Sequence, residues 1–535
     1  MKMKDFSIVA LTLVGAIITS CSKDNKIIDI QQPQQDNVVT LTSNININSG
    51  TRALNDDGTN CTKTFAAGDQ VAVVYKNTSN ETVKALSNAL TAGDISNAGK
   101  TATITVTLTN PADNGNLQLI YPAAMAKATI ATDATVDDAG TVNFDALASQ
   151  NGTLASLASN LDLCTFTGAL NGTDLPNTAS LTNKLAICKF TINDNASNDI
   201  TSSVTKFVIT DGTGIYTVTP SSLSSIYVAI PPVASEKTIT LTATKGSEYF
   251  TKSVTGKALA ASNLYPITVG MNKAYAFSVD VSKKVLIAPG NLQATYDGTS
   301  WSWAFAEHQW DYIGNAAGNT SINGDGTVSA NGTVDLFGWV GATGVDAYGI
   351  SNRTGAVDYY GKEKEESLKS DWGNTIGSGW RTPTIDEWYC LIETRESGAT
   401  VNGTSNARRV YATINTDATP VNGMILFPDG VTISTSEATS WSTINGEGSF
   451  AEATKCTSAQ WNALAAKGCV FLPAAGLRQG ADVADHQLSY GYYWSSSPGS
   501  YSDRAQNLKF GNNAVASTNW LNRYCGASVR LVRDL

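Results

Sequence analysis

Few residues of this chain combine side chains in a way that suggests catalysis. There are only two histidines, and one of them, His308, stands next to Glu307 and two residues before Trp310. A His–Glu pair could serve acid–base chemistry, but the aromatic neighbours favour a structural run that packs against a core. His486 lies in a polar segment and is interpreted as a solvated loop residue. Because no pattern brings a nucleophile, a base and an orienting group together, we expect no enzymatic activity.

Cysteine is the other reactive residue type, and the chain has eight. Cys390, Cys456, Cys469 and Cys525 could contain a reactive pair, although structural disulfides are the interpretation we favour for an exported domain. No CxxC pair occurs, so we expect no zinc site. The chain also lacks the Glu-Pro-Asn and Trp-Asn-Asp signatures of calcium-dependent sugar sites. We therefore predict no metal and no cofactor.

Cys21 has a chemistry set by what precedes it. Lys2 and Lys4 form a charged region, residues 8–18 an apolar one, and Ile-Thr-Ser stands directly before the cysteine. This order resembles a bacterial lipoprotein signal, which implies removal of residues 1–20 and attachment of lipid such as palmitate to Cys21. The apolar run is too short to span a bilayer. We expect an exported protein of the cell outer membrane, facing the extracellular side.

Arg52 is a candidate site of proteolysis. It is a basic residue in a polar run, the composition in which proteolytic nicking concentrates. Upstream, residues 38–42 alternate apolar and polar side chains and predict a short strand. A cut between Arg52 and Ala53 would let that strand leave and give its sheet a vacant edge, a template for another chain. The alternative is that Arg52 is an ordinary loop residue in a disordered leader.

The composition narrows the class of protein. The chain has 535 residues, enough for about three domains. Only 15% of residues are charged, while glycine is frequent, which is typical of extracellular β domains with many turns. The formal net charge of -10 disfavours nucleic acid and anionic membrane surfaces as partners, because both require a basic face.

Short strand signals repeat from residue 53 to about 272. Residues 102–108 alternate apolar side chains with threonine, as a strand with one buried face does. Residues 117–121 form another strand pattern that ends at Pro122. Helical patterns are scarce, and Gly, Asn and Asp punctuate the series, so the pattern predicts β-sandwich architecture.

Several motifs in this region resemble the fimbrillin family of Bacteroidetes pilins. Phe65 with the run Gly-Asp-Gln-Val-Ala-Val at 68–73 is similar to the family's opening motif, and residues 263–269 to its closing strand. Further similar segments are 121–122, 150–154, 185–190 and 226–231. The resemblance covers about residues 40–272. It implies a propeptide at 21–52 with a removable strand, followed by two tandem β-sandwiches, which we place at 53–180 and 181–272.

The same resemblance implies how such a precursor matures. A trypsin-like, arginine-specific protease would cut after Arg52, and other fimbrillin subunits would then be joined by donor strand exchange. The expected location is a fimbrium at the cell surface.

A different domain begins near residue 277. All 11 Trp of the chain lie after Ala274. Landmarks at 289–293, 379–384, 470–476, 493–497 and 527–532 resemble the C-type-lectin-like domains of Bacteroidetes surface proteins, which are distantly similar to the sulfatase-modifying-factor fold. The resemblance covers 277–535 and implies an α+β binding domain. The whole chain is thus predicted to be mainly β.

One helix is predicted in this domain. Thr384 is suited to cap its start. The expected apolar face consists of Ile385, Trp388, Tyr389, Leu391 and Ile392.

Tyr, Trp, Ser and Asn are dense near the C-terminus, between expected strands. Tyr and Trp offer large rigid contact area, and Ser and Asn offer adaptable hydrogen bonds, as in antibody loops. Trp494 belongs to a landmark run and is expected in the core, and half of the others could be core or turn residues. The candidate ligand-binding residues are Tyr490, Tyr492, Tyr501, Asn512, Asn519, Trp520, Asn522 and Tyr524.

These observations favour a fimbrial tip adhesin. The C-terminus of the pilin-like part runs directly into the large domain, so its last strand is poorly placed for donation to a neighbour. Such a subunit would accept a strand after cleavage and cap a filament, with a host glycan or protein bound by the C-terminal domain. The alternative is a lipid-anchored glycan- or protein-binding protein of the cell surface that never polymerises.

Overall fold

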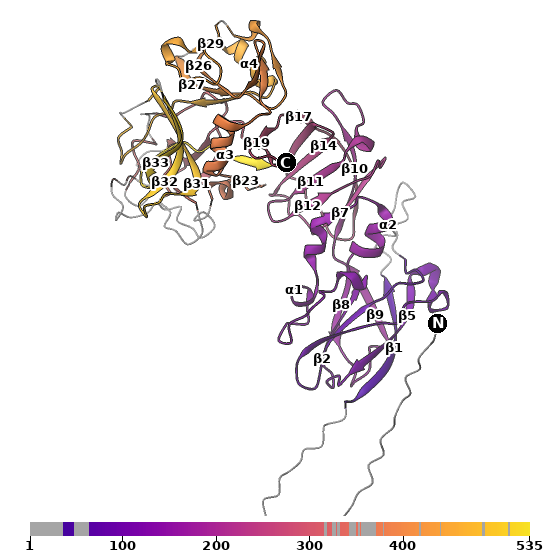
Figure 1. Cartoon of the computed structure of the whole chain (residues 1–535). Helices are drawn as coiled ribbons and strands as arrows, with labels where there is room; N and C mark the ends of the chain where they lie inside the picture. Colours follow the sequence, from indigo (N-terminus) through magenta and orange to yellow (C-terminus); the bar gives the residue numbers. More distant parts are fainter. Residues whose placement is uncertain are drawn as a thin grey trace, which may run out of the picture.

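The computed structural model describes residues 36–47, 64–314, 318–323, 328, 332–341, 349–350, 352, 354, 371–377 and 379–535, the last without 417–418, 439, 484–486 and 512–513. Strands account for 46% and helices for 13%, so the predicted mainly β fold is confirmed. Two β-rich regions and a C-terminal domain follow one another along the molecule (Figure 1). Cys21, Arg52, Ala53, Cys61, His486 and Asn512 lie outside the described residues.

The first β region is one eight-stranded sheet that curls around its own core. Bridges at Ser87–Val106 and Asn77–Pro111 connect the chain around β3 back to β5, so that the sheet encloses apolar side chains on its inner side. Its strands, in spatial order, are β3 (Thr82–Leu86), β2 (Ala72–Lys76), β6 (Asn116–Tyr121), β8 (Cys164–Ala169), β9 (Thr178–Asn183), β1 (Val38–Ile47), β5 (Thr101–Thr109) and β4 (Ile95–Ser96).

Strand β1 is longer than predicted and lies inside this sheet. It pairs antiparallel with β5 over nine residue pairs, from Val38–Thr109 to Asn46–Thr101. On its other side, residues 44–47 run parallel to 178–181 of β9. The expectation that its loss leaves one vacant edge is therefore wrong, because departure of β1 would uncover the edges of both β5 and β9.

The side chains of β1 alternate as the sequence pattern requires. Leu41, Ser43, Ile45 and Ile47 are buried, and Ile45 has no exposed surface. On the outer face, the hydroxyls of the threonines at 40 and 42 lie 3.1 and 3.4 Å from those of Thr107 and Thr105. Burial of one aliphatic side chain is worth about 1.5–3 kcal/mol, so β1 contributes to the stability of the first core.

The second β region packs two sheets against each other around a separate core. One sheet is β13 (Ile226–Ile230), β10 (Ala186–Asn193) and β16 (Leu264–Gly270). The other is β17 (Asn272–Ala274), β15 (Glu248–Thr255), β14 (Thr238–Lys245), β11 (Lys206–Thr210), β12 (Ile215–Val218) and β7 (Ser149–Gln150).

The boundary between the two regions is not at residue 180. β9 stays in the first sheet to Asn183, and Leu185 is the first residue after it whose side chain belongs to the second core. The chain also visits the second core earlier, through Met125, Leu157 and β7. The short helices α1 (Asp138–Thr141) and α2 (Leu154–Ser156) lie in this connecting segment. A domain boundary placed at one residue cannot describe this chain, because the chain crosses between the two cores more than once.

Among its described residues, the C-terminal domain combines small sheets with two α-helices and a few shorter helical turns. Its sheets are β18 (Phe277–Ser278), β19 (Lys284–Ile287), β34 (Val532–Asp534) and β23 (Trp380–Arg381); β21 (Trp301–Phe305), β20 (Leu292–Tyr296) and β22 (Gly332–Val334); β25 (Thr404–Ala407), β24 (Ala399–Val401) and β28 (Thr432–Ile433); β29 (Thr454–Thr457), β26 (Arg409–Asn415), β27 (Pro420–Leu426) and β30 (Val470–Pro473); and β31 (Tyr490–Pro498), β32 (Arg504–Gly511) and β33 (Ala514–Asn522).

Helix α3 (Ile385–Tyr389) begins where the sequence predicts. The Thr384 hydroxyl accepts a hydrogen bond from the Glu387 amide at 3.2 Å, and the Glu387 carboxylate accepts one from the Thr384 amide at 2.9 Å. This reciprocal capping box satisfies two amides at the start of the helix. Ile385, Trp388, Leu391 and Ile392 are buried as expected, but Tyr389 is 45% exposed, so its placement on the apolar face was wrong.

Helix α4 (Ser458–Ala466) was not predicted. It too begins with a capping box, between Thr457 and Gln460, and buries Trp461 and Leu464. The Thr-x-x-Gln spacing before an apolar residue was the signal in the sequence that could have located it.

The C-terminal domain is attached to the second β region at both of its ends. β16 leads into β17, which pairs with β15 over three residue pairs, and β18 of the C-terminal domain follows directly. Arg533 on β34 donates a hydrogen bond from Nη2 to Thr251 Oγ1 on β15 at 2.8 Å. The end of the chain therefore lies beside the second β region, where Figure 1 places the C label.

We predict that Ile45→Ala lowers the free energy of unfolding of the uncut protein by about 2–5 kcal/mol, because it leaves a cavity in a closed core. Thr42→Ala, on the outer face of the same strand, should change it by no more than about 0.5 kcal/mol. Urea unfolding of both variants measures the difference. Equal effects of the two substitutions would contradict the internal position of β1.

Candidate functional site

Two of the predicted ligand-binding residues form an exposed aromatic pair. Tyr501 lies in the turn between β31 and β32 and is 62% exposed, and Trp520 on β33 is 38% exposed. Their rings meet edge to face, with centroids 6.0 Å apart. The guanidinium of Arg504 lies 5.3 Å from the Tyr501 ring centroid. Exposed aromatic rings next to a cation make a surface suited to stacking against a ligand.

The register of β32 and β33 shows which residues share the face of Trp520. Gln506 is directly opposite Trp520, and Arg504 is opposite Asn522, so all four side chains stand on one side of the sheet. Asn522 donates to the Tyr524 hydroxyl at 2.8 Å. The Gln506 side-chain oxygen is buried without a hydrogen-bond partner among the described residues. We define Tyr501, Arg504, Gln506, Trp520, Asn522 and Tyr524 as the aromatic face.

Sequence reasoning missed Arg504 and Gln506. Neither belongs to the Tyr, Trp, Ser and Asn set by which the region was found. The signal that identifies them is their pairing opposite Asn522 and Trp520, which requires the strand register.

Three other candidates lie elsewhere. Tyr492 is only 5% exposed and packs in a core of the C-terminal domain, so its prediction as a surface residue was wrong. Tyr490 is at the far end of β31, where the Lys509 ammonium lies 5.0 Å from its ring centroid. Asn519 faces the other side of the sheet and donates to the buried Asn507 at 3.1 Å. Alternation along a strand sends neighbouring residues to opposite faces.

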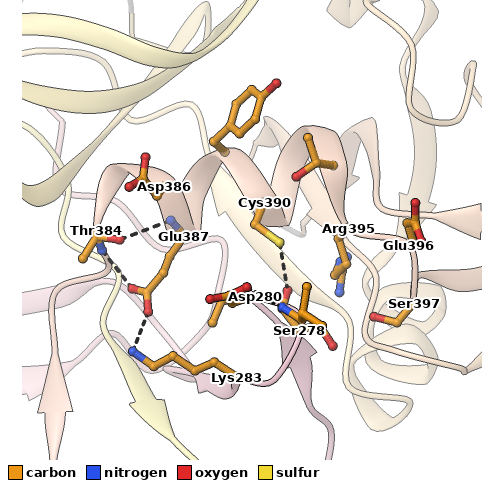
Figure 2. A pocket seen from close by; sticks show the side chains of 14 residues that line it. Ser278, Asp280, Lys283, Thr384, Asp386, Glu387, Cys390, Arg395, Glu396 and Ser397 are labelled. Carbon is orange, nitrogen blue, oxygen red and sulfur yellow. Dashed lines mark hydrogen bonds and ion pairs between the residues drawn. The ribbon is translucent and has the colours of Figure 1, made fainter.

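A cavity of about 860 Å³ lies between α3 and the turn after β18 (Figure 2). Its lining includes Cys390, whose thiol donates to the Ser278 carbonyl at 3.8 Å. Burial is the main reason why the pKa of this thiol is raised, which disfavours the reactive thiolate. No histidine is among the described residues that line the cavity.

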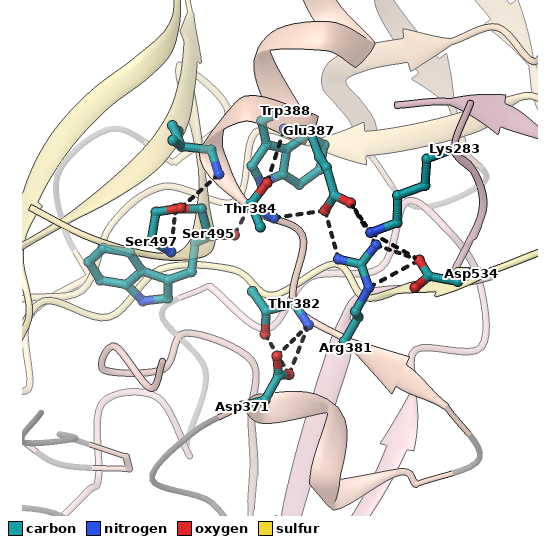
Figure 3. Close-up of polar contacts among 12 residues, drawn as sticks. Lys283, Asp371, Arg381, Thr382, Thr384, Glu387, Trp388, Ser495, Ser497 and Asp534 are labelled. Carbon is teal, nitrogen blue, oxygen red and sulfur yellow. Dashed lines mark hydrogen bonds and ion pairs between the residues drawn. The ribbon is translucent and has the colours of Figure 1, made fainter. Parts of the chain in front are cut away.

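An ion-pair network closes one side of this region (Figure 3). Arg381 binds both oxygens of Glu387 at 2.7 Å and contacts Asp534 at 2.6 Å, and Lys283 binds Glu387 at 2.9 Å. Burial acts to raise the pKa of Glu387, but the bonds from Arg381 and Lys283 outweigh it and lower the pKa to about 2. The network joins the start of α3 to β23, β34 and the turn before β19.

Helix α3 is also fixed to the sheet that carries the aromatic face. The Trp388 indole donates to the Trp494 carbonyl at 3.1 Å, and the Ile385 amide donates to the Ser497 hydroxyl at 3.0 Å (Figure 3). Both acceptors are on β31. Trp494 itself is fully buried, as the sequence indicates. The aromatic face is thus supported from behind by the domain's own core.

The cysteines do not form the disulfides that we favoured. Cys390, Cys456, Cys469 and Cys525 are all free thiols. Most are fully buried among apolar neighbours, where cysteine serves as a small apolar residue. Cys456 and Cys469 share one core without a bond between them, and burial raises the pKa of Cys456 to about 12.

His308 is exposed, which corrects its expected packing against a core. Its ring stacks on Trp310 at 4.7 Å, and Nδ1 lies 3.3 Å from the Asp311 carboxylate. The aromatic neighbour, rather than the histidine, packs against the core.

Neither a family model nor a curated protein matches this sequence. Among solved structures, a candidate cell adhesion protein from Bacteroides uniformis is 17% identical and aligns with 44% of this chain and 94% of its own, with a TM-score of 0.27. A fimbrial assembly protein from Parabacteroides distasonis is 12% identical over 46% of this chain and 95% of its own, at 0.26. A fimbrial protein from Bacteroides ovatus is 10% identical over 92% and 99%, at 0.23. TM-scores of this size do not establish a shared family or function.

The described residues include neither a candidate membrane-spanning helix nor a candidate metal site. None of their helices has the length and apolar character needed to cross a membrane. No group of three or more His, Cys, Asp or Glu side chains in that part of the chain is arranged to hold a metal ion.

We predict that acid removes the contribution of Glu387 to stability. Its folded pKa of about 2 is below the ordinary value of 4.5, so the contribution is complete above about pH 4.5 and is lost as the pH falls toward 2. The loss amounts to at most about 3 kcal/mol. Urea unfolding at several pH values measures it.

Two variants test the assignment. Glu387→Gln should flatten the pH dependence over that range, because the titrating carboxyl is gone. Glu396→Gln, at an exposed glutamate nearby, should keep it. An unchanged pH profile in Glu387→Gln would contradict the role of the network.

Proposed function

We propose that this chain is an exported cell-surface adhesin, a fimbrial subunit that accepts a donor strand in its first β region and binds its ligand through the C-terminal domain. The internal position of β1 supports this most strongly. β1 precedes Arg52, and residues 48–71 connect it covalently to β2, the next strand of its sheet. A single cut in that segment turns a central strand into a separate peptide.

The two strands that flank β1 define which strand could replace it. A donor strand must pair antiparallel with β5 and parallel with β9 at the same time. It must also present apolar side chains at alternate positions, where Leu41, Ile45 and Ile47 now lie. Another fimbrillin subunit would supply such a strand by β-strand addition. The proposed protease is trypsin-like and specific for arginine, and it cuts between Arg52 and Ala53.

In the proposed scheme, cleavage alone does not remove β1 from its position between β5 and β9. The nine pairs with β5 and the buried side chains hold β1 without any covalent link. The cut strand is therefore expected to stay in the sheet and not to leave unaided. In the proposed scheme the leader stays bound until a competing strand displaces it, which protects the core meanwhile.

The attachment of the C-terminal domain supports a position at the end of a filament. β16 pairs with β10 over seven residue pairs and is held at its far end by β17 and β18. Its donation to a neighbour would require both attachments to break. A subunit that accepts a strand but donates none caps the filament.

The remaining parts of the proposal concern location and ligand. Lipid on Cys21 would hold the precursor at the outer membrane until cleavage. The aromatic face, with the Tyr501–Trp520 pair at its centre, would bind a host glycan or protein. Many filaments acting together would compensate for a weak single contact. The role is one of binding, with no catalysis, no cofactor and no nucleic-acid partner.

We predict that an arginine-specific protease converts the purified precursor into a body that starts at Ala53, as read by N-terminal sequencing. The leader should co-elute with the body in gel filtration and be released by an excess of a synthetic peptide with the sequence of residues 38–47. Arg52→Gln should remain uncut. If surface-extracted protein keeps residues 22–52 and lipidated Cys21, the non-polymerising anchored protein is correct instead.

We predict that Tyr501→Ala and Trp520→Ala each weaken ligand binding about tenfold or more, because exposed aromatic anchors dominate such contacts. A glycan and protein array probed with the whole protein identifies the ligand and measures the loss. Tyr389→Ala is the matched control, since it removes an exposed tyrosine on α3. Equal loss in all three variants would place the ligand elsewhere.

A further inference from the structure

A second cavity, of about 490 Å³, lies where the C-terminal domain meets the second β region. One wall comes from β15 and β17, with Thr251, Ser253 and Asn272, and the other from β19, β23 and β34. The side chains of Tyr275, Trp380 and Arg533 also line it. The volume is within the usual range for small-molecule sites.

The charge of this cavity is unlike that of the whole protein. Arg533, Lys252 and Lys273 line it, whereas no Asp or Glu is among its described lining residues. Lys273 is ion-paired with Glu248 at 2.7 Å, outside the lining. In a chain with a formal net charge of -10, this local excess of positive charge would attract an anion.

Arg533 is the unusual residue. It is only 6% exposed, and its guanidinium lies 5.0 Å from the centroid of the Trp380 ring. Nη2 donates to Thr251 Oγ1, but Nε is buried with no hydrogen-bond partner, and no carboxylate within the described part of the chain forms an ion pair with it. Burial lowers its pKa to about 10.

Other buried arginines of the same domain have more hydrogen-bond or ion-pair partners, although Nε of Arg395 and of Arg409 also lacks one. Arg395 has an ion pair with Asp429 at 3.0 Å, and Arg530 donates five hydrogen bonds, to Asn291, Gln309 and the carbonyls of Ala288, Gln309 and Phe471. A buried guanidinium with a single hydroxyl partner is costly by comparison. The missing partner is an acceptor with negative charge.

We propose that this cavity binds an acidic sugar, whose carboxylate or sulfate pairs with Arg533 and whose ring lies against Trp380 and Tyr275. The planar guanidinium fork matches the two oxygens of such a group. The Asn272 side chain also lines the cavity and can bond sugar hydroxyls, whereas the hydroxyls of Thr251 and Ser253 are already bonded to the Leu241 carbonyl and to Thr240. This site is distinct from the aromatic face.

Because its walls belong to two regions of the chain, the bound acid joins them. The ligand contacts β15 and β17 on one side and β23 and β34 on the other. Binding should therefore be saturable, and it should raise the thermal stability of the whole protein.

Isothermal titration of the full chain with glucuronate, glucose and inorganic sulfate tests the proposal. Glucuronate should bind, sulfate more weakly, and glucose at least about tenfold more weakly than glucuronate, because a charged hydrogen bond to a buried group is lost. Equal binding of glucose and glucuronate, or no binding of the acid at millimolar concentration, would overturn it. Sulfate binding without glucuronate binding would overturn the sugar part of the site.

Variants locate the acid. Arg533→Met should weaken glucuronate at least about tenfold. If it does not fold, Arg533→Lys, which keeps the charge and loses the fork, should still weaken binding severalfold. Lys455→Gln removes an exposed cation on β29 and should bind as the parent does. Loss of glucuronate binding in Trp520→Ala with retention in Arg533→Met would place the acid on the aromatic face and overturn the proposal.

Discussion

The pairing of β1 on both of its edges is the constraint on which the rest of the first β region depends. A strand at the border of a sheet satisfies half of its backbone groups with neighbours and half with water. β1 instead bonds β5 along its length and β9 near its end, and it closes the core with Leu41, Ile45 and Ile47. The contacts by which β1 stabilises the core also restrict which strand could take its position, because such a strand needs apolar side chains at the same alternate positions.

The sequence predicts local features of this fold well and non-local ones poorly. The alternation at 38–42 predicts β1, and Thr384 as a capping residue predicts the start of α3, because both signals are contained in a few neighbouring residues. The sequence pattern places Tyr389 on the apolar face of α3, yet the helix turns its ring to solvent. Whether β1 lies inside or at the edge of its sheet depends on residues near 105 and 180, which no local pattern connects with it.

The candidate sites follow the same division. The density of Tyr, Trp and Asn near the C-terminus leads to Tyr501 and Trp520, but only the register of β32 and β33 separates these from Tyr492 and Asn519 and adds Arg504 and Gln506. Arg533 carries no signal at all in the sequence. Its significance comes from a hydroxyl 282 positions earlier in the chain and from the lack of an ion pair with any carboxylate of the described residues.

The two neighbours of β1 also fix the direction in which a strand can run between them. β5 is antiparallel and β9 is parallel to β1, so a strand between them can satisfy both pairings in only one direction. A guest strand laid in the reverse sense would mismatch both ladders of backbone bonds. Units linked through this position must all point the same way, and a chain of them has a distinct head and tail.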